Sequence, residues 1–257
     1  MADWYDYPQY FDMVFRDETA AEVLFFEQAF ARFGLAKTKH LLEPGCGSGR
    51  LVAAMAARGY DVCGVDLNQR MLTYLRRRLR RRDLSADVLL GDMVDLSIGQ
   101  KYDAAFCTFN TFRHLLTEQD CIAHLNSIAQ HLRVGGIYVL GFHIIPLDAD
   151  PESTERWTVS HGGTKVSMTL KVIEFERNVR KERLRASIKA TKRSGKVERI
   201  RSEFDLRLYT TSQVKKLLQK VSDVLEIAEI YDFDYDIDEP REFDDDLTDA
   251  VFVLRRI

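Results

Sequence analysis

Three glycines, Gly45, Gly47 and Gly49, lie within the segment EPGCGSGR at residues 43–50. An apolar run precedes this segment and an apolar helical pattern follows it, which predicts a turn between a strand and a helix. Glycines in such a turn let the backbone approach a ligand closely, and the helix N-terminus offers unpaired N–H groups to an anionic or carbonyl-rich group. The GxGxG spacing, followed by Arg50, differs from the GxGxxG of dinucleotide sites. The segment therefore predicts a cradle for a single nucleoside.

Two carboxylates follow the next two expected strands. Asp66 ends DVCGVD at residues 61–66, where a carboxylate can accept both hydroxyls of a ribose. Asp92 lies in GDM at residues 91–93, where it can hold an adenine amino group. Because the carboxyl ends of parallel strands meet in one crevice, these groups are expected to converge. A simple tight turn is the alternative for the glycine segment alone, and the two carboxylates in register argue against it.

Short apolar runs and amphipathic helical patterns alternate from His40 to Phe142. This alternation is typical of βαβ units and predicts a doubly wound α/β fold with a mostly parallel sheet. The end of the chain adds one helix and two strands. The expected strands are 40–43, 61–66, 86–90, 102–109, 135–142, 225–231 and 250–256, and the expected helices are 50–58, 68–83, 117–132 and 212–221.

A different pattern begins after Pro146. Apolar and polar residues alternate strictly in TKVSMTLKV at residues 164–172, as in a half-buried strand. The sequence KRSGK at residues 192–196 fits a hairpin turn. We expect an inserted antiparallel β-sheet of three or four strands, whose inward-packed residues include Val166, Met168, Leu170 and Val172.

The composition limits the classes of function. The chain has 257 residues, 46% of them hydrophobic, and can bury a full core. Its net charge of −3 argues against general electrostatic binding to nucleic acid or to an anionic membrane. No apolar run is long enough to span a bilayer. The four cysteines include no CxxC pair, and the first residues do not resemble a signal peptide, which favours a cytoplasmic location.

Two charged segments have alternative interpretations. The arginine-rich helix 68–83 could suggest RNA binding, but its leucines recur on one face, so its arginines are expected to be a solvated face. The acidic segment 231–246 lacks the glycine and spacing of a calcium loop. We therefore expect an acidic loop there and no metal site.

Five segments occur in the order and spacing of successive methyltransferase motifs: EPGCGSG, Asp66, GDM, YDAAFCTFNTFRHL and LRVGGIYVLGF. Over residues 38–142 the chain resembles the class I S-adenosylmethionine-dependent methyltransferases. The resemblance implies a Rossmann-like sheet of seven strands, the last of them antiparallel, and S-adenosylmethionine as cofactor. It implies that the cofactor is bound by Glu43, Gly45, Cys46, Gly47, Gly49, Asp66, Leu67, Met71, Gly91, Asp92, Met93, Thr108 and Phe109.

A narrower resemblance concerns the ends of this core. The segment at residues 10–30 is similar to the N-terminal helical cover of small-molecule N-methyltransferases, including those that act on amino-sugars and carry a β insertion. In FNTFRHLL, His114 lies where that group has a histidine facing the substrate, and Asn110 and Tyr10 are further catalytic candidates. The implied domains are a helical cover at 1–37, a cofactor-binding domain at 38–150 and 210–257, and the β insertion at 151–209.

These features predict a methyltransferase that transfers a methyl group to a small-molecule acceptor, an amine, by in-line displacement. As a general base His114 would titrate at about 6 to 7, whereas a structural role for it, or catalysis by alignment alone, is the alternative. An RNA or protein methyltransferase and a non-catalytic S-adenosylmethionine-binding scaffold are the alternative functions. The expected partner is the acceptor itself, with a homodimer through the β insertion also considered and no nucleic acid or membrane expected.

Overall fold

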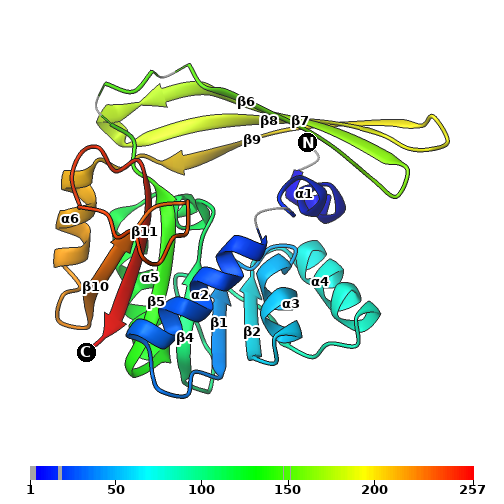
Figure 1. The fold of residues 1–257 in the computed structure, drawn as a ribbon. Helices are drawn as coiled ribbons and strands as arrows, with labels where there is room; N and C mark the ends of the chain where they lie inside the picture. Colours follow the sequence, from blue (N-terminus) through cyan, green and yellow to red (C-terminus); the bar gives the residue numbers. More distant parts are fainter. Residues whose placement is uncertain (1–3, 17–18, 147, 151) are drawn as a thin grey trace.

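The computed structural model describes residues 4–16, 19–146, 148–150 and 152–257. Residues 1–3 and 17–18 of the expected helical cover, and residue 151 of the expected insertion, lie outside the described residues. Figure 1 shows a sheet flanked by helices, with a second sheet arched above it.

The larger sheet has seven strands in the order β10-β11-β5-β4-β1-β2-β3. β11 runs antiparallel to both of its neighbours, β10 and β5, and the other strand pairs are parallel, so the expected Rossmann-like α/β fold is confirmed. We call this the parallel sheet. Its strands are β1 (His40–Pro44), β2 (Asp61–Asp66), β3 (Asp87–Leu90), β4 (Tyr102–Cys107), β5 (Leu132–His143), β10 (Leu225–Tyr231) and β11 (Asp249–Arg256).

Helices cover both faces of the parallel sheet. Alternate residues of β4 point to opposite faces, so Ala105 packs with the helices α5 and α6, and Phe106 packs with α2, α3 and α4. Two separate apolar layers result, as a doubly wound sheet requires. The helices are α2 (Thr19–Phe33), α3 (Arg50–Ala57), α4 (Gln69–Arg81), α5 (Glu118–His131) and α6 (Thr211–Gln219). Among the described residues, no helix is long and apolar enough to cross a membrane.

The insertion is a four-stranded antiparallel meander between β5 and α6, which we call the inserted sheet. Its strands are β6 (Thr154–His161), β7 (Thr164–Glu176), β8 (Lys181–Thr191) and β9 (Val197–Arg207). It lies over the carboxyl ends of the parallel strands (Figure 1). Val166 and Met168 are buried on its inner face as expected. Leu170 and Val172 are only half-buried, and both line a cavity, although Leu170 also packs against the cluster that contains Val166 and Met168.

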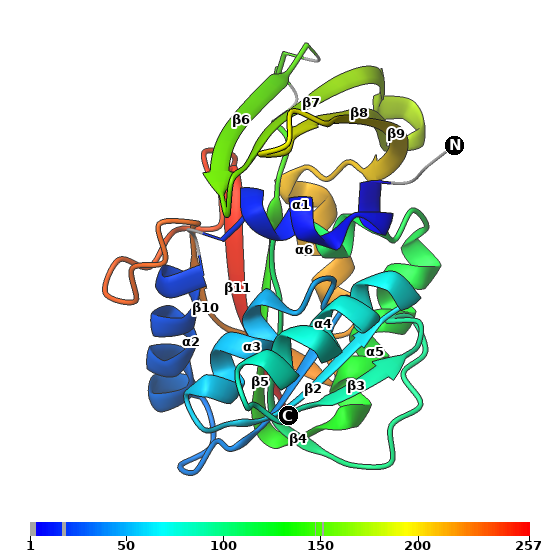
Figure 2. The same ribbon diagram turned by 90° about the vertical axis from the view of Figure 1, so that its right-hand side faces the viewer.

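The N-terminal cover consists of separate pieces. The short helices η1 (Trp4–Asp6) and α1 (Pro8–Val14) lie between the inserted sheet and α4, whereas α2 packs beside the parallel sheet (Figure 2). Trp4 stacks on Phe204 of β9, with ring centroids 5.7 Å apart. Buried Asp12 forms an ion pair with Arg78 of α4 and accepts a hydrogen bond from Tyr74 at 3.1 Å. The arginines of α4 are therefore not all exposed to solvent as expected. The ion pair of Arg78 with Asp12 joins the N-terminal cover to the core.

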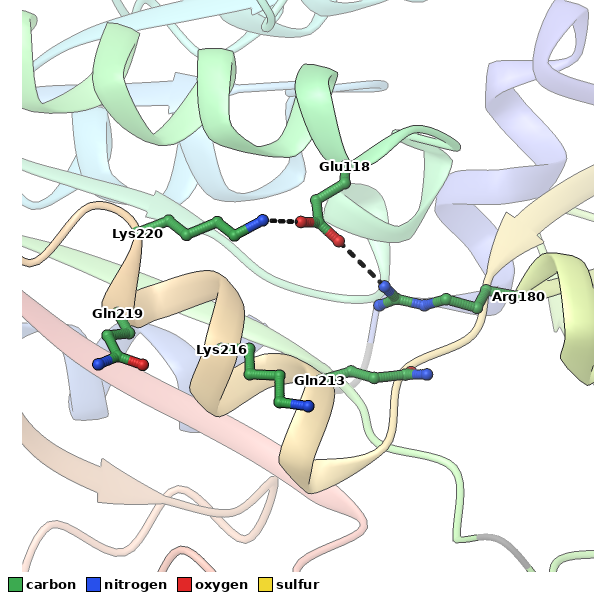
Figure 3. A pocket seen from close by; sticks show the side chains of 6 residues that line it. All are labelled: Glu118, Arg180, Gln213, Lys216, Gln219 and Lys220. Carbon is green, nitrogen blue, oxygen red and sulfur yellow. Dashed lines mark hydrogen bonds and ion pairs between the residues drawn. The ribbon is translucent and has the colours of Figure 1, made fainter.

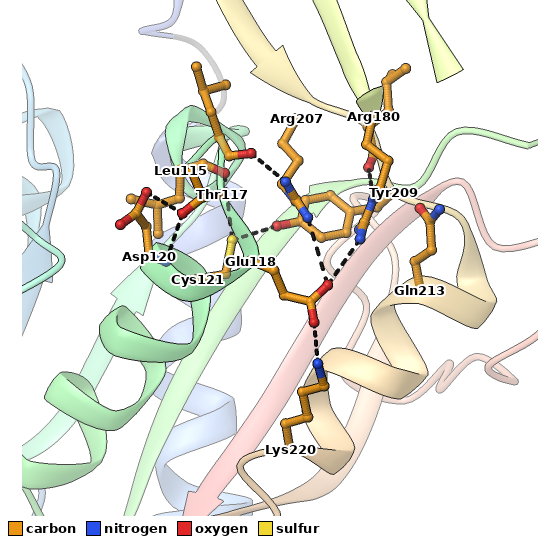
Figure 4. A network of polar contacts seen from close by, with 12 residues as sticks. Leu115, Thr117, Glu118, Asp120, Cys121, Arg180, Arg207, Tyr209, Gln213 and Lys220 are labelled. Atoms are coloured by element: carbon orange, nitrogen blue, oxygen red, sulfur yellow. Dashed lines mark hydrogen bonds and ion pairs between the residues drawn. The ribbon is translucent and has the colours of Figure 1, made fainter. Parts of the chain in front are cut away.

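The base of the inserted sheet is joined to α5 and α6 through Glu118. This carboxylate pairs with Lys220, with Arg180 at 3.3 Å and with Arg207 at 3.8 Å (Figure 4). Arg180 precedes β8 and Arg207 ends β9, so one acid links two strand ends of the insertion to two helices. These ion pairs help to hold the inserted sheet in its position over the parallel sheet.

Candidate active site

A cavity of about 990 Å³ lies at the carboxyl ends of the parallel strands. Doubly wound sheets bind ligands at this edge. Residues after β1, β2 and β3 line what we call the nucleoside end: Gly45, Gly47, Asp66, Leu67, Asp92 and Met93. Residues of η1, of the turn after β4 and of the inserted sheet line the acceptor end: Trp4, Tyr5, His114, Trp157, Leu170 and Phe204.

The three glycines of the opening segment serve two purposes. All have positive φ, at +67°, +52° and +69°. A Cβ at Gly45 would lie 2.4 Å from Thr111, and one at Gly49 would lie 2.1 Å from Leu75, so these two glycines permit close packing. Gly47 has nothing within 4 Å of that position and borders the cavity. Gly49 does not line the cavity, and Gly47 is the glycine that leaves room for a ligand.

Asp66 is held in place by the glycine segment itself. Its carboxylate accepts the N–H of Gly47 at 2.7 Å and the N–H of Asn68 at 2.7 Å. Burial raises the pKa of Asp66, and the two N–H groups oppose that rise. Each carboxylate oxygen keeps a second acceptor site. The arrangement can accept two hydroxyls from one ribose.

Glu43 is a buried carboxyl at the same end of the cavity. Among the described residues its Oε2 atom has no hydrogen-bond partner. Burial raises its pKa to about 8, although the charge of Arg50 acts in the opposite direction. An unpartnered buried oxygen is costly unless a ligand satisfies it. The residues therefore fit a cofactor that carries a ribose and a cationic amino-acid group.

The end of β3 supplies further lining residues to this end of the cavity. Asp92 accepts the N–H of Val94 at 2.9 Å through one oxygen, which leaves the other for a ligand. The Nδ1 atom of His124 donates a hydrogen bond to the backbone carbonyl oxygen of Met93 at 2.8 Å. The other cofactor candidates that line the cavity are Cys46, Leu67, Met71, Gly91, Thr108 and Phe109. The Cys46 thiol is buried, which raises its pKa well above the usual value.

The turn after β4 carries backbone strain. Phe109 and Asn110 both have a φ of +64°, which is uncommon for residues with a side chain. Asn110 accepts the His143 N–H at 2.9 Å through Oδ1, and this bond fixes the turn against the end of β5. Strained turns of this kind cluster at functional sites. Asn110 lines the cavity, but its amide oxygen already has a structural partner.

Glu22 was not singled out by the sequence analysis. It lies on α2, fully buried, where it pairs with Arg50 and accepts the Thr108 hydroxyl at 2.7 Å. It thus joins the cover, the helix after the glycine segment and the end of β4. Its only sequence signal is a carboxylate on the apolar face of an amphipathic helix.

His114 lies at the acceptor end, where its Nε2 atom is 2.9 Å from the Tyr5 hydroxyl. Burial, together with the charge of Arg113, lowers its pKa to about 4. The expected pKa of about 6 to 7 is therefore wrong in this environment. The ring is neutral at ordinary pH and pairs with Tyr5, a residue that the sequence analysis missed.

Tyr10, the third catalytic candidate, does not line the cavity. Its hydroxyl donates to Glu198 of β9, and burial raises its pKa to about 12. The structure thus brings His114 and Asn110 to the cavity and leaves Tyr10 packed between α1 and the inserted sheet. Within the described ranges, no group of three or more His, Cys, Asp or Glu side chains is arranged to hold a metal ion.

Comparison with known proteins identifies related sequences for the core. Residues 41–136 match the family described as a methyltransferase domain. The chain is 32% identical over 133 residues to dTDP-3-amino-3,6-dideoxy-alpha-D-glucopyranose N,N-dimethyltransferase from Streptomyces fradiae, covering 51% of this chain and 50% of that protein. It is 33% identical over 100 residues to dTDP-3-amino-3,4,6-trideoxy-alpha-D-glucopyranose N,N-dimethyltransferase from Streptomyces venezuelae, covering 39% and 40%. The matched part thus spans half or less of these curated relatives.

The fold likeness extends over the whole chain. The crystal structure of Streptomyces venezuelae DesVI superimposes with a TM-score of 0.79 at 19% identity and covers 100% of both chains. An amino pentose methyltransferase from Micromonospora echinaspora superimposes with a TM-score of 0.69 at 22% identity, covering 94% of this chain and 91% of that one. Residues 41–136 of this chain thus match a methyltransferase domain, and the whole chain has the same fold as these solved structures.

Proposed function

We propose that this chain is an S-adenosylmethionine-dependent methyltransferase that acts on a small-molecule amine. One observation carries the proposal: a single cavity joins the nucleoside end to an acceptor end that no side chain of the described residues fills. A scaffold that had lost its acceptor would have no such space. An RNA methyltransferase would need an open basic groove, whereas residues of the inserted sheet and of α1, such as Leu170 and Phe11, line this cavity together with the strand ends.

The residues of the nucleoside end have defined tasks in this proposal. Asp66 accepts the ribose hydroxyls, Asp92 and Met93 lie beside the adenine, and Gly47 and Glu43 bind the amino-acid part. Bound there, S-adenosylmethionine supplies a sulfonium methyl group that an amine lone pair attacks in line, leaving a neutral sulfide. The chain contributes mainly by holding the amine close to that methyl group and aligned with it.

The acceptor end orients the amine. His114 is neutral, and the hydrogen bond between its Nε2 atom and the Tyr5 hydroxyl fixes the orientation of its ring. With a pKa of about 4 it is a weak base, so the amine must lose its proton to solvent before its lone pair attacks the methyl group. Methylation adds a positive charge to the nitrogen, and the proton that it then loses passes to solvent. His114 and Tyr5 are thus orienting groups.

The domain boundaries form part of the proposal. Residues 1–37 cover the cofactor, residues 38–150 and 210–257 bind it, and residues 151–209 enclose the acceptor. The four cysteines are all buried free thiols, which supports a reducing cytoplasm as the location. A homodimer through the insertion stays a prediction, which light scattering of the purified chain would test.

Methyl transfer tests the proposed activity. Purified protein, S-adenosylmethionine with a tritiated methyl group and a panel of primary amines should give labelled amine, and Asp66→Ala should abolish the label. Cofactor binding without transfer to any amine would instead support the non-catalytic scaffold. Label appearing on RNA or protein would support the other alternative.

A further inference from the structure

We propose that the acceptor end takes an amine with an apolar or aromatic body and without phosphate, and that Glu155 attracts its positive charge. This inference rests on the proposed function and specifies its substrate class. It differs from the substrates in the names of the Streptomyces relatives, which are dTDP-linked amino-sugars and carry two phosphates.

The charges that line the cavity are mostly negative. Among the described residues, seven carboxyl groups line it, of which Glu43 has a raised pKa of about 8 and stays mostly protonated at pH 7. Only two side chains with a permanent positive charge line it, Arg50 and Arg113. Both arginines are committed, because Arg50 pairs with buried Glu22 and Arg113 pairs with buried Glu182. A diphosphate needs cationic donors for its oxygens. This lining attracts a cation and repels a diphosphate.

A cluster of positively charged side chains lies outside this cavity. Arg180, Lys216 and Lys220 surround Glu118 at a separate, smaller hollow of about 260 Å³ between α5, α6 and the start of β8 (Figure 3). There Glu118 already pairs with Arg180 and Lys220. None of these three side chains lines the larger cavity. These three cations therefore stabilise the contact between the inserted sheet and the helices α5 and α6, and they do not face the acceptor end of the larger cavity.

The part of the acceptor away from its amine would contact aromatic and aliphatic side chains of the cavity. The aromatic side chains that line the cavity come from η1, α1, the turn after β4 and the inserted sheet: Trp4, Tyr5, Phe11, Phe15, Phe109, Trp157, Phe175 and Phe204. Four aliphatic side chains line it as well: Leu170, Val172, Leu184 and Leu206. Such a surface binds apolar or aromatic bodies through burial and ring contacts. It also stabilises a nearby ammonium over the ring faces.

Glu155 is the carboxylate best placed to select the charge. It lies on β6 opposite Leu170 of β7, so both side chains point to the inner face of the inserted sheet, and both line the cavity. Among the described residues it has no ion-pair partner, in contrast to Glu182 on β8 and Glu198 on β9. Its negative charge is therefore available to an incoming ammonium group.

The test measures binding to protein saturated with S-adenosylhomocysteine. The probes are tryptamine, phenethylamine and hexylamine, each paired with the carboxylate of similar shape, together with thymidine diphosphate. We expect at least one amine to bind about tenfold or more tightly than its carboxylate counterpart, and thymidine diphosphate not to displace it. Glu155→Gln should weaken amine binding about three- to fivefold, because the group is exposed, and leave S-adenosylhomocysteine binding unchanged. The control Glu203→Gln, on the outer face of β9, should change neither.

Three results would overturn the inference. They are competition by thymidine diphosphate, carboxylates binding as tightly as the amines, or equal effects of Glu155→Gln and Glu203→Gln on amine binding. In each case saturation with S-adenosylhomocysteine would still support the proposed cofactor. Failure of S-adenosylhomocysteine to bind would count against the proposed function, and the two failures are therefore distinguishable.

Discussion

Arg113, in the turn after β4, and Glu182, on β8, form a buried ion pair that joins the parallel sheet to the inserted sheet. The Arg113 Nε atom also donates to the carbonyl of Arg207 at 2.8 Å. Burial lowers the pKa of Arg113, and the charge of Glu182 opposes that effect. The pair adjoins the cavity, so it positions the acceptor end as well as the insertion.

Removing one partner of this pair should be strongly destabilising. Glu182→Leu leaves a buried guanidinium without its counter-charge, and we expect a loss of about 3–5 kcal/mol in unfolding free energy. The double variant Arg113→Met with Glu182→Leu should recover most of that loss. Glu203→Leu, which breaks the exposed pair with Arg185, should cost about 1 kcal/mol or less. Denaturant unfolding measures all four proteins, and equal losses for Glu182→Leu and Glu203→Leu would show that the buried pair does not join the sheets.

The pH profile of turnover should not show the titration of His114. Because its pKa is about 4, the ring stays neutral from pH 5.5 to 8.5, and any rise in rate should follow ionisation of the amine. His114→Asn should lower kcat about tenfold or more without changing the shape of the profile, and Tyr5→Phe should lower it less. Steady-state rates across this range measure the effect. A step near pH 6.5 that disappears in His114→Asn would contradict the orienting role.

Stability should fall as the pH drops from about 6.5 towards 4. Burial lowers the pKa values of His114 and His124 from 6.5 to about 4, so the unfolded chain binds protons in this window that the folded chain does not. The stabilisation is therefore present above pH 6.5 and lost below it. His114→Asn should show a smaller difference in unfolding free energy between pH 7 and pH 5 than the parent does. An equal or larger difference would mean that His114 is not buried as described.

Cofactor binding should release a proton from Glu43. With its pKa raised from 4.5 to about 8, this carboxyl is mostly protonated at pH 7, and a cationic ligand beside it favours the ionised form. The heat of S-adenosylmethionine binding should therefore depend on the ionisation heat of the buffer, as in a comparison of phosphate with Tris. In Glu43→Gln this dependence should disappear and binding should weaken. The same buffer dependence in Glu43→Gln would assign the proton to another group.

Local patterns explain why much of the site could be predicted from the sequence. The glycine segment and Asp66 follow apolar strands directly, and strand ends in a parallel sheet must meet at one edge. The alternation in residues 164–172 likewise predicted a strand of the insertion. Strand ends were less accurate, as with β5, which begins at Leu132 and not at 135. Where a strand begins depends on its hydrogen bonds to the neighbouring strands, and the pattern of apolar residues does not show these bonds.

Long-range pairs explain what the sequence did not predict. Tyr5 and His114 are 109 positions apart, Glu22 and Thr108 are 86 apart, and Arg113 and Glu182 are 69 apart. No periodicity links such residues, since only the packing of the cover and the insertion against the core brings them together. The low pKa of His114 has the same origin, because burial under the inserted sheet causes it.

Titration of S-adenosylhomocysteine into four proteins tests the central claim most directly. The proteins are the parent, Asp66→Ala, Gly47→Ala and the control Gly59→Ala. Gly47 and Gly59 both have positive φ and open space where a Cβ would stand, but only Gly47 borders the cavity. The two alanine variants therefore share the backbone strain and differ in their effect on a ligand.

We predict saturable binding to the parent and to Gly59→Ala. Loss of the ribose hydrogen bonds in Asp66→Ala should cost about 2–4 kcal/mol, and Gly47→Ala should weaken binding at least tenfold. Absence of binding to the parent, or equal binding by the parent, Asp66→Ala and Gly47→Ala, would contradict the assignment of this cavity to S-adenosylmethionine.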